Sequence, residues 1–190
     1  MKLFFATANA GKLRELRELS QGLPLEIASL GDRPGAAQVD ETGDSFAANA
    51  ILKAEAWARR EGGWALADDS GLCVDALGGG PGVRSARWSG GGDSGNNARL
   101  LRELAGQPPE RRGAEYRCAL ALSDGKDSYL VEALCRGRIA AAPRGSGGFG
   151  YDPLFEVGEL GWRTFGEASP QEKARLSHRA QAFRQLRPIL

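Results

Sequence analysis

The chain has 190 residues, of which 42% are hydrophobic and 26% are charged, a composition that excludes a largely disordered protein. Its 25 basic and 24 acidic residues leave a net charge of +1, so no overall charge draws the protein to nucleic acid or to a membrane surface. No apolar run approaches the roughly 20 residues that a membrane-spanning helix needs.

The order of apolar and polar residues predicts alternating strands and helices. The expected elements, in chain order, are a strand at 2–7, a helix at 11–21, a strand at 23–30, a loop at 31–43, a helix at 45–61, a short strand at 64–67, a strand or turn at 72–77, a helix at 93–105, strands at 116–122 and 128–139, and a strand at 153–157. This order predicts an α/β fold with a mixed sheet, and Asp124-Gly125 predicts a hairpin within it. No linker separates two parts, so residues 1–190 are expected to form a single domain.

Two helices are expected near the end of the chain. Ser169-Pro170-Gln171-Glu172 has the pattern of a capping box with proline at the first helical position, and Ser177 could cap a second helix at 178–187. In one unbroken helix, His178 would lie about 140° and Arg179 about 240° around the axis from Lys173. Only a break in the helix near Ser177 would let the three side chains point to the same site, and the sequence does not decide whether the helix breaks there.

The three cysteines, Cys73, Cys118 and Cys135, bear on where the protein resides. Their odd number and the lack of a C-x-x-C spacing argue against a disulfide framework or a zinc site. They lie in apolar stretches and are expected to be small core residues. A reducing compartment suits such a chain, so we expect a cytoplasmic protein.

The first candidate site follows the first strand and opens the first helix, at Thr7-Ala8-Asn9-Ala10-Gly11-Lys12. Backbone N–H groups at a helix N-terminus bind anions, and a lysine adds a positive charge. The segment is not a P-loop, because Ala6 and Leu13 stand where that motif needs Gly and Ser or Thr. It predicts a phosphate site; the alternative is an ordinary strand–helix turn with a solvated lysine.

Two acidic pairs form the second candidate. Asp68-Asp69 follows an apolar strand, and neighbouring strand residues point to opposite faces, so one carboxylate should face a ligand and the other a structural partner. Together with Asp40-Glu41 they could hold Mg²⁺, which takes one or two carboxylates, waters and substrate phosphates. The alternative is turn chemistry, in which Asp and Ser are common.

The third and fourth candidates lie in the second half of the chain. Gly145 to Pro153 is a glycine-rich loop that includes Phe149 and Tyr151, and an aromatic ring there could stack on a flat base. Lys173 and the run Ser177-His178-Arg179 supply further polar groups. The alternatives are a mobile hairpin loop, a solvated lysine and a structural histidine.

Taken together, these segments resemble the inosine triphosphate pyrophosphatase family over nearly the whole chain and in the family's order. The matching segments are Thr7–Lys12, Glu41-Thr-Gly43 with Phe46 and Asn49–Ala54, Ala67–Leu72, Gly78–Gly82, Ser85–Arg87 with Ser89-Gly90, Gly147–Pro153, and Glu172-Lys173 with Ser177–Arg179. Two positions depart from the family pattern: Ala8 stands where Gly is usual, and Asp40 stands where Glu is usual.

The resemblance implies an elongated α/β fold with a central mixed, twisted sheet and two lobes flanking a substrate cleft. It implies one nucleoside triphosphate pyrophosphatase domain over 1–190, acting as a homodimer with Mg²⁺. The implied reaction converts the deaminated purine nucleotides ITP, dITP and XTP to the monophosphate and pyrophosphate, which keeps them out of DNA and RNA. No nucleic-acid or membrane partner is expected.

The resemblance also assigns roles. Asp69 is the expected general base, which takes a proton from the attacking water. The expected metal ligands are Asp69 with Asp40 or Glu41, a choice that the sequence leaves open. The residues expected to bind substrate are Thr7, Ala8, Asn9, Ala10, Gly11, Lys12, Lys53, Ser70, Phe149, Gly150, Tyr151, Asp152, Lys173, His178 and Arg179.

Base choice is expected to come from Phe149 and Arg179. Phe149 would stack on the purine, and Arg179, which carries only donors, would favour the six-keto oxygen over the adenine amine. An alternative function is a related pyrophosphatase for modified pyrimidine nucleotides, and another is an inactive nucleotide sensor. Phe149 and the run Ser177-His178-Arg179 argue against the first, and Asp69, Lys12 and Lys173 argue against the second.

Overall fold

The computed structural model describes residues 1–33, 35–36 and 39–190. Three positions of the loop expected at 31–43, Pro34, Ala37 and Gln38, lie outside the described residues. The strands are β1 (Lys2–Phe5), β2 (Glu26–Ser29), β3 (Ala65–Val74), β4 (Gly113–Ser123), β5 (Ser128–Ile139), β6 (Phe155–Val157) and β7 (Arg163–Thr164). The helices are α1 (Ala10–Leu19), α2 (Phe46–Glu61), α3 (Gly92–Glu103), α4 (Pro170–Leu176) and α5 (His178–Leu186).

The strands form one mixed sheet in the order β2-β1-β3-β4-β5-β6-β7. β1 is parallel to both β2 and β3, with Phe4 opposite Ala65, whereas β6 is antiparallel to β5 and β7. The predicted α/β fold with a mixed sheet is therefore confirmed. β7, which has only two residues, was not predicted.

The contacts divide the chain into two compact units. Unit 1 comprises Met1–Asp69, Cys118–Ala133 and Arg179–Leu190, and unit 2 comprises Ser70–Arg117 and Leu134–His178. β3, β4 and β5 contribute residues to both units. The single domain over 1–190 stays a prediction.

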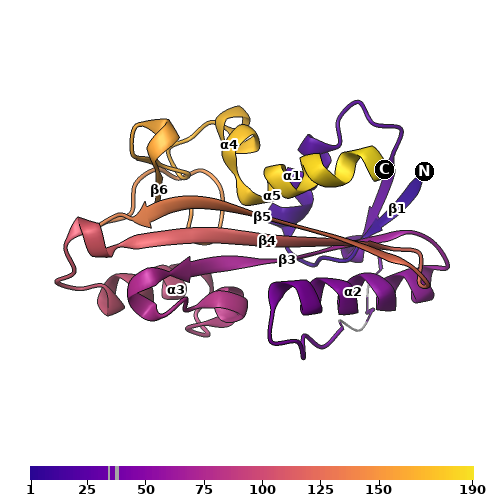
Figure 1. Cartoon of the computed structure of the whole chain (residues 1–190), viewed down its shortest axis with the longest axis horizontal. Helices are drawn as coiled ribbons and strands as arrows, with labels where there is room; N and C mark the ends of the chain where they lie inside the picture. Colours follow the sequence, from indigo (N-terminus) through magenta and orange to yellow (C-terminus); the bar gives the residue numbers. More distant parts are fainter. Residues whose placement is uncertain (34, 37–38) are drawn as a thin grey trace. The chain divides into compact units, whose positions relative to one another are not determined.

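In unit 1, helices cover both faces of the strands, with α2 on one face and α1 and α5 on the other (Figure 1). The alternation of β1 produces this arrangement, because successive side chains point to opposite faces. Leu3 and Phe5 belong to the buried cluster that includes Leu16 of α1 and Phe183 of α5. Phe4, between them, stacks on Trp57 of α2 with a ring-centroid distance of 4.8 Å.

Unit 2 has its own core, in which aromatic rings meet. Tyr116 of β4 packs on Phe155 of β6 and on Phe165, with ring-centroid distances of 4.6 and 6.4 Å. Leu100 of α3 belongs to the same buried cluster. The helix α3 is fixed to the preceding segment by the buried Asn96, whose Oδ1 accepts from the backbone N–H of Ser89 at 2.8 Å.

The acidic pair lies in a different setting from the one expected. The strand expected at 64–67 was predicted to end before Asp68 to Gly71, with a turn as one alternative for these residues, but β3 runs without interruption from Ala65 to Val74. β3 lies between β1 and β4 in the sheet, and its place there overrides the turn preference of Asp, Ser and Gly, although β1 pairs only with Ala65 and Leu66. Extended backbone through Asp68 and Asp69 keeps the two carboxylates on opposite faces of the sheet.

The break between the last two helices is present. Ser169 and Glu172 form the predicted capping box, and α4 ends at Leu176. Ser177 has extended backbone, with φ −63° and ψ 151°, so α5 starts in a new direction at His178. The directions of the Lys173, His178 and Arg179 side chains are therefore not set by the periodicity of one continuous helix.

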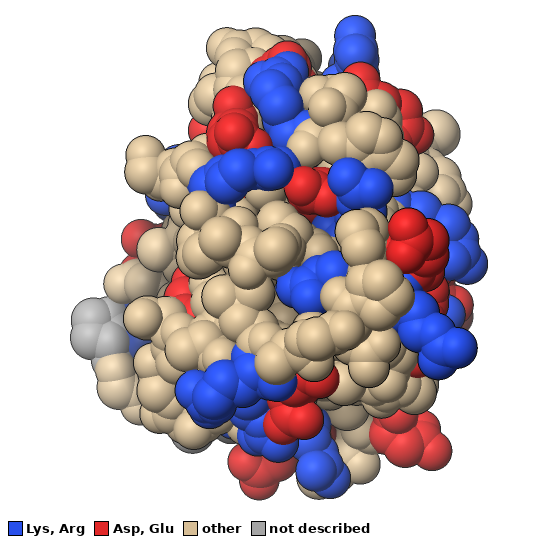
Figure 2. Space-filling view, turned by 90° about the vertical axis from the view of Figure 1, so that its left-hand side faces the viewer, with Lys and Arg blue, Asp and Glu red and all other residues tan. Residues whose placement is uncertain are grey.

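No helix in the described part of the chain is long and apolar enough to cross a membrane. On the face in Figure 2, basic and acidic side chains are interspersed. This mixture agrees with the net charge of +1.

Candidate active site

The turn between β1 and α1 is built by its own polar side chains. Asn9 is the N-cap of α1, and its Oδ1 accepts from the backbone N–H of Lys12 at 3.1 Å. Thr7 Oγ1 accepts from the backbone N–H of Asn9 at 3.1 Å. Each side chain also carries an N–H or O–H group that can donate to a ligand. The helix N-terminus carries a partial positive charge that suits phosphate.

Asp69 lies at the centre of a polar cluster on the α2 side of β3. Its Oδ1 is 3.0 Å from Lys53 Nζ, and its Oδ2 accepts from Asn49 Nδ2 at 3.2 Å. Asn49 and Lys53 are one turn apart on α2, which places both on the same side of that helix. Lys53 Nζ also lies 2.8 Å from Glu41 Oε1. Glu41 and Asp69 therefore share one lysine.

Burial raises the pKa of the Asp69 carboxyl above its ordinary value, although the nearby Lys53 and Lys12 oppose the shift. The negative charge of Glu41 acts in the same direction as burial. A carboxylate with a raised pKa is a better proton acceptor than an exposed one. Asp69 thus has the environment of a general base.

The neighbouring Asp68 points to the other face and makes different contacts. Its buried carboxylate lies between two cations: Oδ1 is 2.5 Å from Lys12 Nζ and Oδ2 is 2.6 Å from Arg179 Nε. The thiol of Cys118 also donates to Oδ2, at 3.5 Å. Arg179 Nη1 in turn contacts Glu15 of α1. Asp68 is the structural partner that strand alternation predicted.

The pKa of Asp68 reflects two opposing effects. Burial alone would raise it, but the charges of Arg179 and Lys12 prevail and hold the pKa well below the ordinary value. Asp68 is therefore ionised at neutral pH. The buried pairs attach α1 and the start of α5 to the centre of β3.

Glu41, rather than Asp40, carries the carboxylate that joins the Asp69 cluster. Asp40 is exposed, whereas Glu41 Oε1, Asp69 Oδ1 and the Asp68 backbone oxygen all lie within 3.0 Å of Lys53 Nζ. Within the described residues, no three His, Cys, Asp or Glu side chains are grouped as a metal site. Two carboxylates and a carbonyl that converge on one cation are nevertheless the hard oxygen donors that Mg²⁺ takes when phosphates complete its shell.

The glycine loop of unit 2 is held by Asp152. Its Oδ2 accepts from the Phe149 backbone N–H at 2.8 Å and contacts Lys173 Nζ, while Tyr116 OH donates to Oδ1 at 3.4 Å. Gly148 has a left-handed φ of +74°, and a Cβ there would lie 2.0 Å from Asp152 Oδ2. The close approach of the carboxylate requires glycine at this position.

Lys173 and His178 lie next to aromatic rings of the same unit. Lys173 Nζ is 4.8 Å from the centroid of the Phe149 ring, and the buried His178 stacks on Tyr116 with a centroid distance of 4.6 Å and a 10° interplanar angle. Tyr151 is buried and donates through its hydroxyl to the Ser85 backbone oxygen at 2.8 Å. The single histidine of the chain therefore packs face to face on an aromatic ring.

The structure places the expected site residues in both units. The expected site residues of unit 1 are those of the turn Thr7–Lys12, which includes Ala8, Ala10 and Gly11, together with Asp40, Glu41, Lys53, Asp69 and Arg179. The expected site residues of unit 2 are Ser70, Phe149, Gly150, Tyr151, Asp152, Lys173 and His178. Ser70 is half-buried in β3 directly after Asp69. Asn49, Glu15 and Tyr116 also contact these groups and were missed. The signal for Asn49 was its helical spacing from Lys53; the sequence pattern contained no signal for the other two.

The chain is similar to known proteins over nearly its whole length. Residues 3–189 match the Ham1 family. A dITP/XTP pyrophosphatase of an Anaeromyxobacter species is 48% identical, with 100% of this chain and 96% of that protein covered. One from Geobacillus kaustophilus is 53% identical over 97% of this chain and 92% of that protein.

The fold is also similar to those of solved structures. A HAM1 protein from Coxiella burnetii aligns with a TM-score of 0.88 and 36% identity over 100% of this chain and 98% of that one. A nucleoside-triphosphatase, or dITP/XTP pyrophosphatase, from Mycobacterium abscessus aligns with a TM-score of 0.76 and 44% identity over 100% and 99% of the two chains. This chain belongs to the Ham1 family.

Proposed function

We propose that this chain hydrolyses the triphosphates of deaminated purines, namely ITP, dITP and XTP, to the monophosphate and pyrophosphate. The names of the relatives support the substrate class, since dITP/XTP pyrophosphatases are about half identical to this chain over nearly their full length. The cellular role would be to keep these nucleotides out of DNA and RNA.

The observation that carries the proposal is the setting of Asp69. This carboxylate is oriented by Lys53 and Asn49, and burial raises its pKa. In the proposed reaction it takes a proton from water, whose oxygen bonds to the α-phosphorus. The bond between the α-phosphorus and the bridging oxygen breaks, and pyrophosphate leaves with that oxygen. Asp69 then returns its proton to solvent.

Lys12 and Lys53 would bind the phosphates together with the backbone N–H groups at the start of α1. Each lysine now contacts a carboxylate, Lys12 with Asp68 and Lys53 with Glu41 and Asp69. We propose that Glu41 and Asp69 hold Mg²⁺ when the substrate binds. The metal ion would supply positive charge to the phosphate oxygens and to the departing pyrophosphate.

In unit 2, Phe149 is the proposed stacking surface for the purine, with Gly150, Tyr151 and Asp152 shaping the loop. Lys173 and His178 lie beside this loop and its Tyr116 neighbour, which supports their place among the substrate contacts. Ser70 directly follows the proposed base. We further propose that the protein is a homodimer, which sedimentation of the purified protein would test. We also propose a cytoplasmic location.

The test of the function is pyrophosphate release measured with ITP, dITP, XTP, ATP and a modified pyrimidine triphosphate, each with and without Mg²⁺. We expect Mg²⁺-dependent release that strongly favours the three deaminated purines. Preference for the pyrimidine would support the alternative enzyme, and binding of ITP without turnover would indicate a sensor.

Arg179→Ala tests how the base is selected. Arg179 bonds Asp68 through Nε and Glu15 through Nη1, so any contact with a six-keto oxygen would be made while these two pairings hold the side chain. Loss of a charged hydrogen bond of about 1.5–3 kcal/mol should lower the ITP-to-ATP ratio of kcat/KM by roughly 10- to 150-fold. If Arg179 only pairs with the two carboxylates, both substrates will decline together and the ratio will hold.

A further inference from the structure

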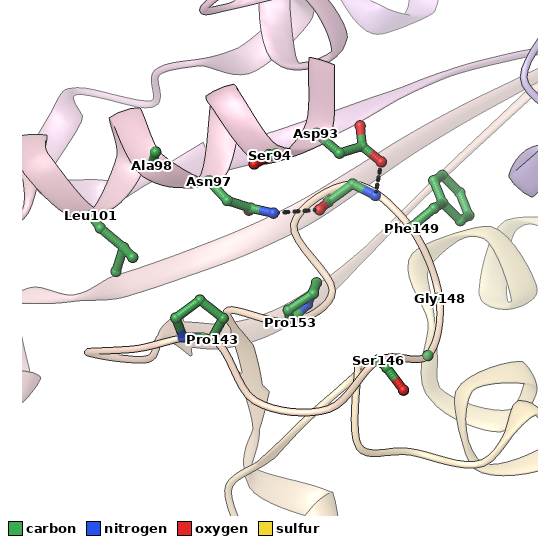
Figure 3. A pocket seen from close by; sticks show the side chains of 12 residues that line it. Asp93, Ser94, Asn97, Ala98, Leu101, Pro143, Ser146, Gly148, Phe149 and Pro153 are labelled. Carbon is green, nitrogen blue, oxygen red and sulfur yellow. Dashed lines mark hydrogen bonds between the residues drawn. The ribbon is translucent and has the colours of Figure 1, made fainter. Parts of the chain in front are cut away.

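Two side chains of α3 hold the backbone of the Phe149 loop at a single residue. Asp93 Oδ2 accepts from the Gly150 N–H at 2.7 Å, and Asn97 Nδ2 donates to the Gly150 carbonyl at 2.9 Å. Both bonds are drawn as dashed lines in Figure 3, where the loop lies beside the helix that carries Asp93 and Asn97. We propose that Asp93 and Asn97 are positioning residues, which hold Phe149 where it contacts the base. This inference rests on the proposed stacking role of Phe149.

The chemistry of the two side chains matches the two backbone groups. A carboxylate only accepts, so Asp93 suits an N–H, whereas the amide of Asn97 supplies the donor that a carbonyl needs. The residues are four apart, so they lie one above the other on the same side of α3. Gly150 has a left-handed φ of +62° and lies in a turn outside the strands and helices, so side chains supply the partners of its N–H and carbonyl.

The helix α3 is a firm support for these bonds. Asn96, next to Asn97 in sequence, is buried and donates to the Ser85 backbone oxygen at 3.1 Å. At Gly95 a Cβ would lie 2.8 Å from Ser89 Oγ, so the helix approaches the preceding segment closely. Leu100 is fully buried in the core. Asp93 and Asn97 therefore project from a helix whose other side is fixed.

The bonds from Asp93 and Asn97 join the Phe149 loop directly to α3. A cavity of about 500 Å³ separates the helix from the loop, and it is lined by Asp93, Asn97, Leu101, Ser146, Phe149 and Pro153 among others (Figure 3). Glycines with left-handed φ at 145, 148 and 150 give the loop many alternative backbone conformations. The Phe149 N–H, one residue before Gly150, donates to Asp152, so Asp152 and the two α3 side chains together hold this short segment.

The test compares Asn97→Asp, Asn97→Ala and Asp93→Ala with Ser94→Ala, whose side chain lies on the same helix and lines the same cavity. KM and kcat are measured with ITP, and inhibition constants with pyrophosphate, which has phosphates but no base. We expect Asn97→Ala to raise KM about 3- to 10-fold, the effect of one neutral hydrogen bond, and Asp93→Ala to raise KM at least as much, because the carboxylate accepts a charged one. Asn97→Asp should act more strongly, because it sets a carboxylate against a carbonyl. Ser94→Ala should match the wild type.

Three further results are expected if the side chains act through Phe149. The pyrophosphate inhibition constant and kcat should stay within about twofold of the wild type. Asp93→Asn, whose amide oxygen can still accept from the Gly150 N–H, should have a KM closer to that of the wild type than to that of Asp93→Ala. In a Phe149→Ala background, Asn97→Ala should add little, because coupled residues are not additive.

Other outcomes would overturn the inference. A parallel rise in KM and in the pyrophosphate constant would show a general loss of structure, as would a lowered urea midpoint in all variants. Full additivity with Phe149→Ala would place the effect elsewhere. If Phe149→Ala itself leaves KM unchanged, the stacking role fails; if it raises KM but the α3 variants do not, only the positioning role fails.

Discussion

Asp69→Asn should reduce turnover of ITP by at least about 10²- to 10⁴-fold, the contribution typical of one general base. The amide cannot take the proton of the attacking water and is a poor ligand for Mg²⁺. The fold should persist, because an amide oxygen can still accept from Lys53 or Asn49, which now bond the carboxylate. The measurement is kcat/KM for ITP at saturating Mg²⁺, with the urea midpoint as the check on folding.

The matched control is Asp127→Asn, an exposed aspartate in the turn between β4 and β5, which should leave activity unchanged. A folded Asp69→Asn variant that keeps more than about a tenth of the wild-type rate would exclude Asp69 as the base. The pH profile offers an independent check. Because the base works when ionised, kcat/KM should fall in acid as Asp69 takes up a proton, and this acid limb should be lost in a variant that lacks the carboxylate.

Asp68→Asn should destabilise the folded protein by about 3–5 kcal/mol, the usual cost of removing one partner of a buried ion pair. The variant leaves Lys12 and the fully buried Arg179 without the carboxylate that lies between them. Such a loss is a large part of the roughly 5–15 kcal/mol that stabilises an ordinary domain. Urea unfolding at neutral pH measures it, and Asp127→Asn should change the midpoint little.

The pH dependence of that difference has a definite sign. Asp68 has a pKa held well below the unfolded value, so its contribution is fully present above about pH 4 and is lost as the pH falls through the folded pKa. The gap between wild type and Asp68→Asn should therefore be constant near neutrality and narrow in acid. If the unfolding free energies of wild type and Asp68→Asn differ by less than about 1 kcal/mol at pH 7, the ion pairs of Asp68 contribute no more than exposed ion pairs do.

Much of the local structure was predictable because it depends on neighbours in sequence. Ser169 and Glu172 form the capping box that their spacing predicts, and Ser177 does end one helix before another begins. Helical spacing put Asn49 and Lys53 on one side of α2, and both now contact Asp69. In the same way, the alternation of strand residues separated the two carboxylates of Asp68 and Asp69.

The sequence by itself therefore determined the α/β class, the helix ends and the side of each element on which the polar residues lie, because capping and periodicity act over a few residues. Only the tertiary structure decided the pairings across long separations: Asp68 with Arg179, Glu41 rather than Asp40 with Lys53, and Asn97 with Gly150. It also decided that β3 continues through Asp68 and Asp69, where neighbouring strands override local turn preference. Such contacts depend on which backbones meet in space, and no local pattern specifies that.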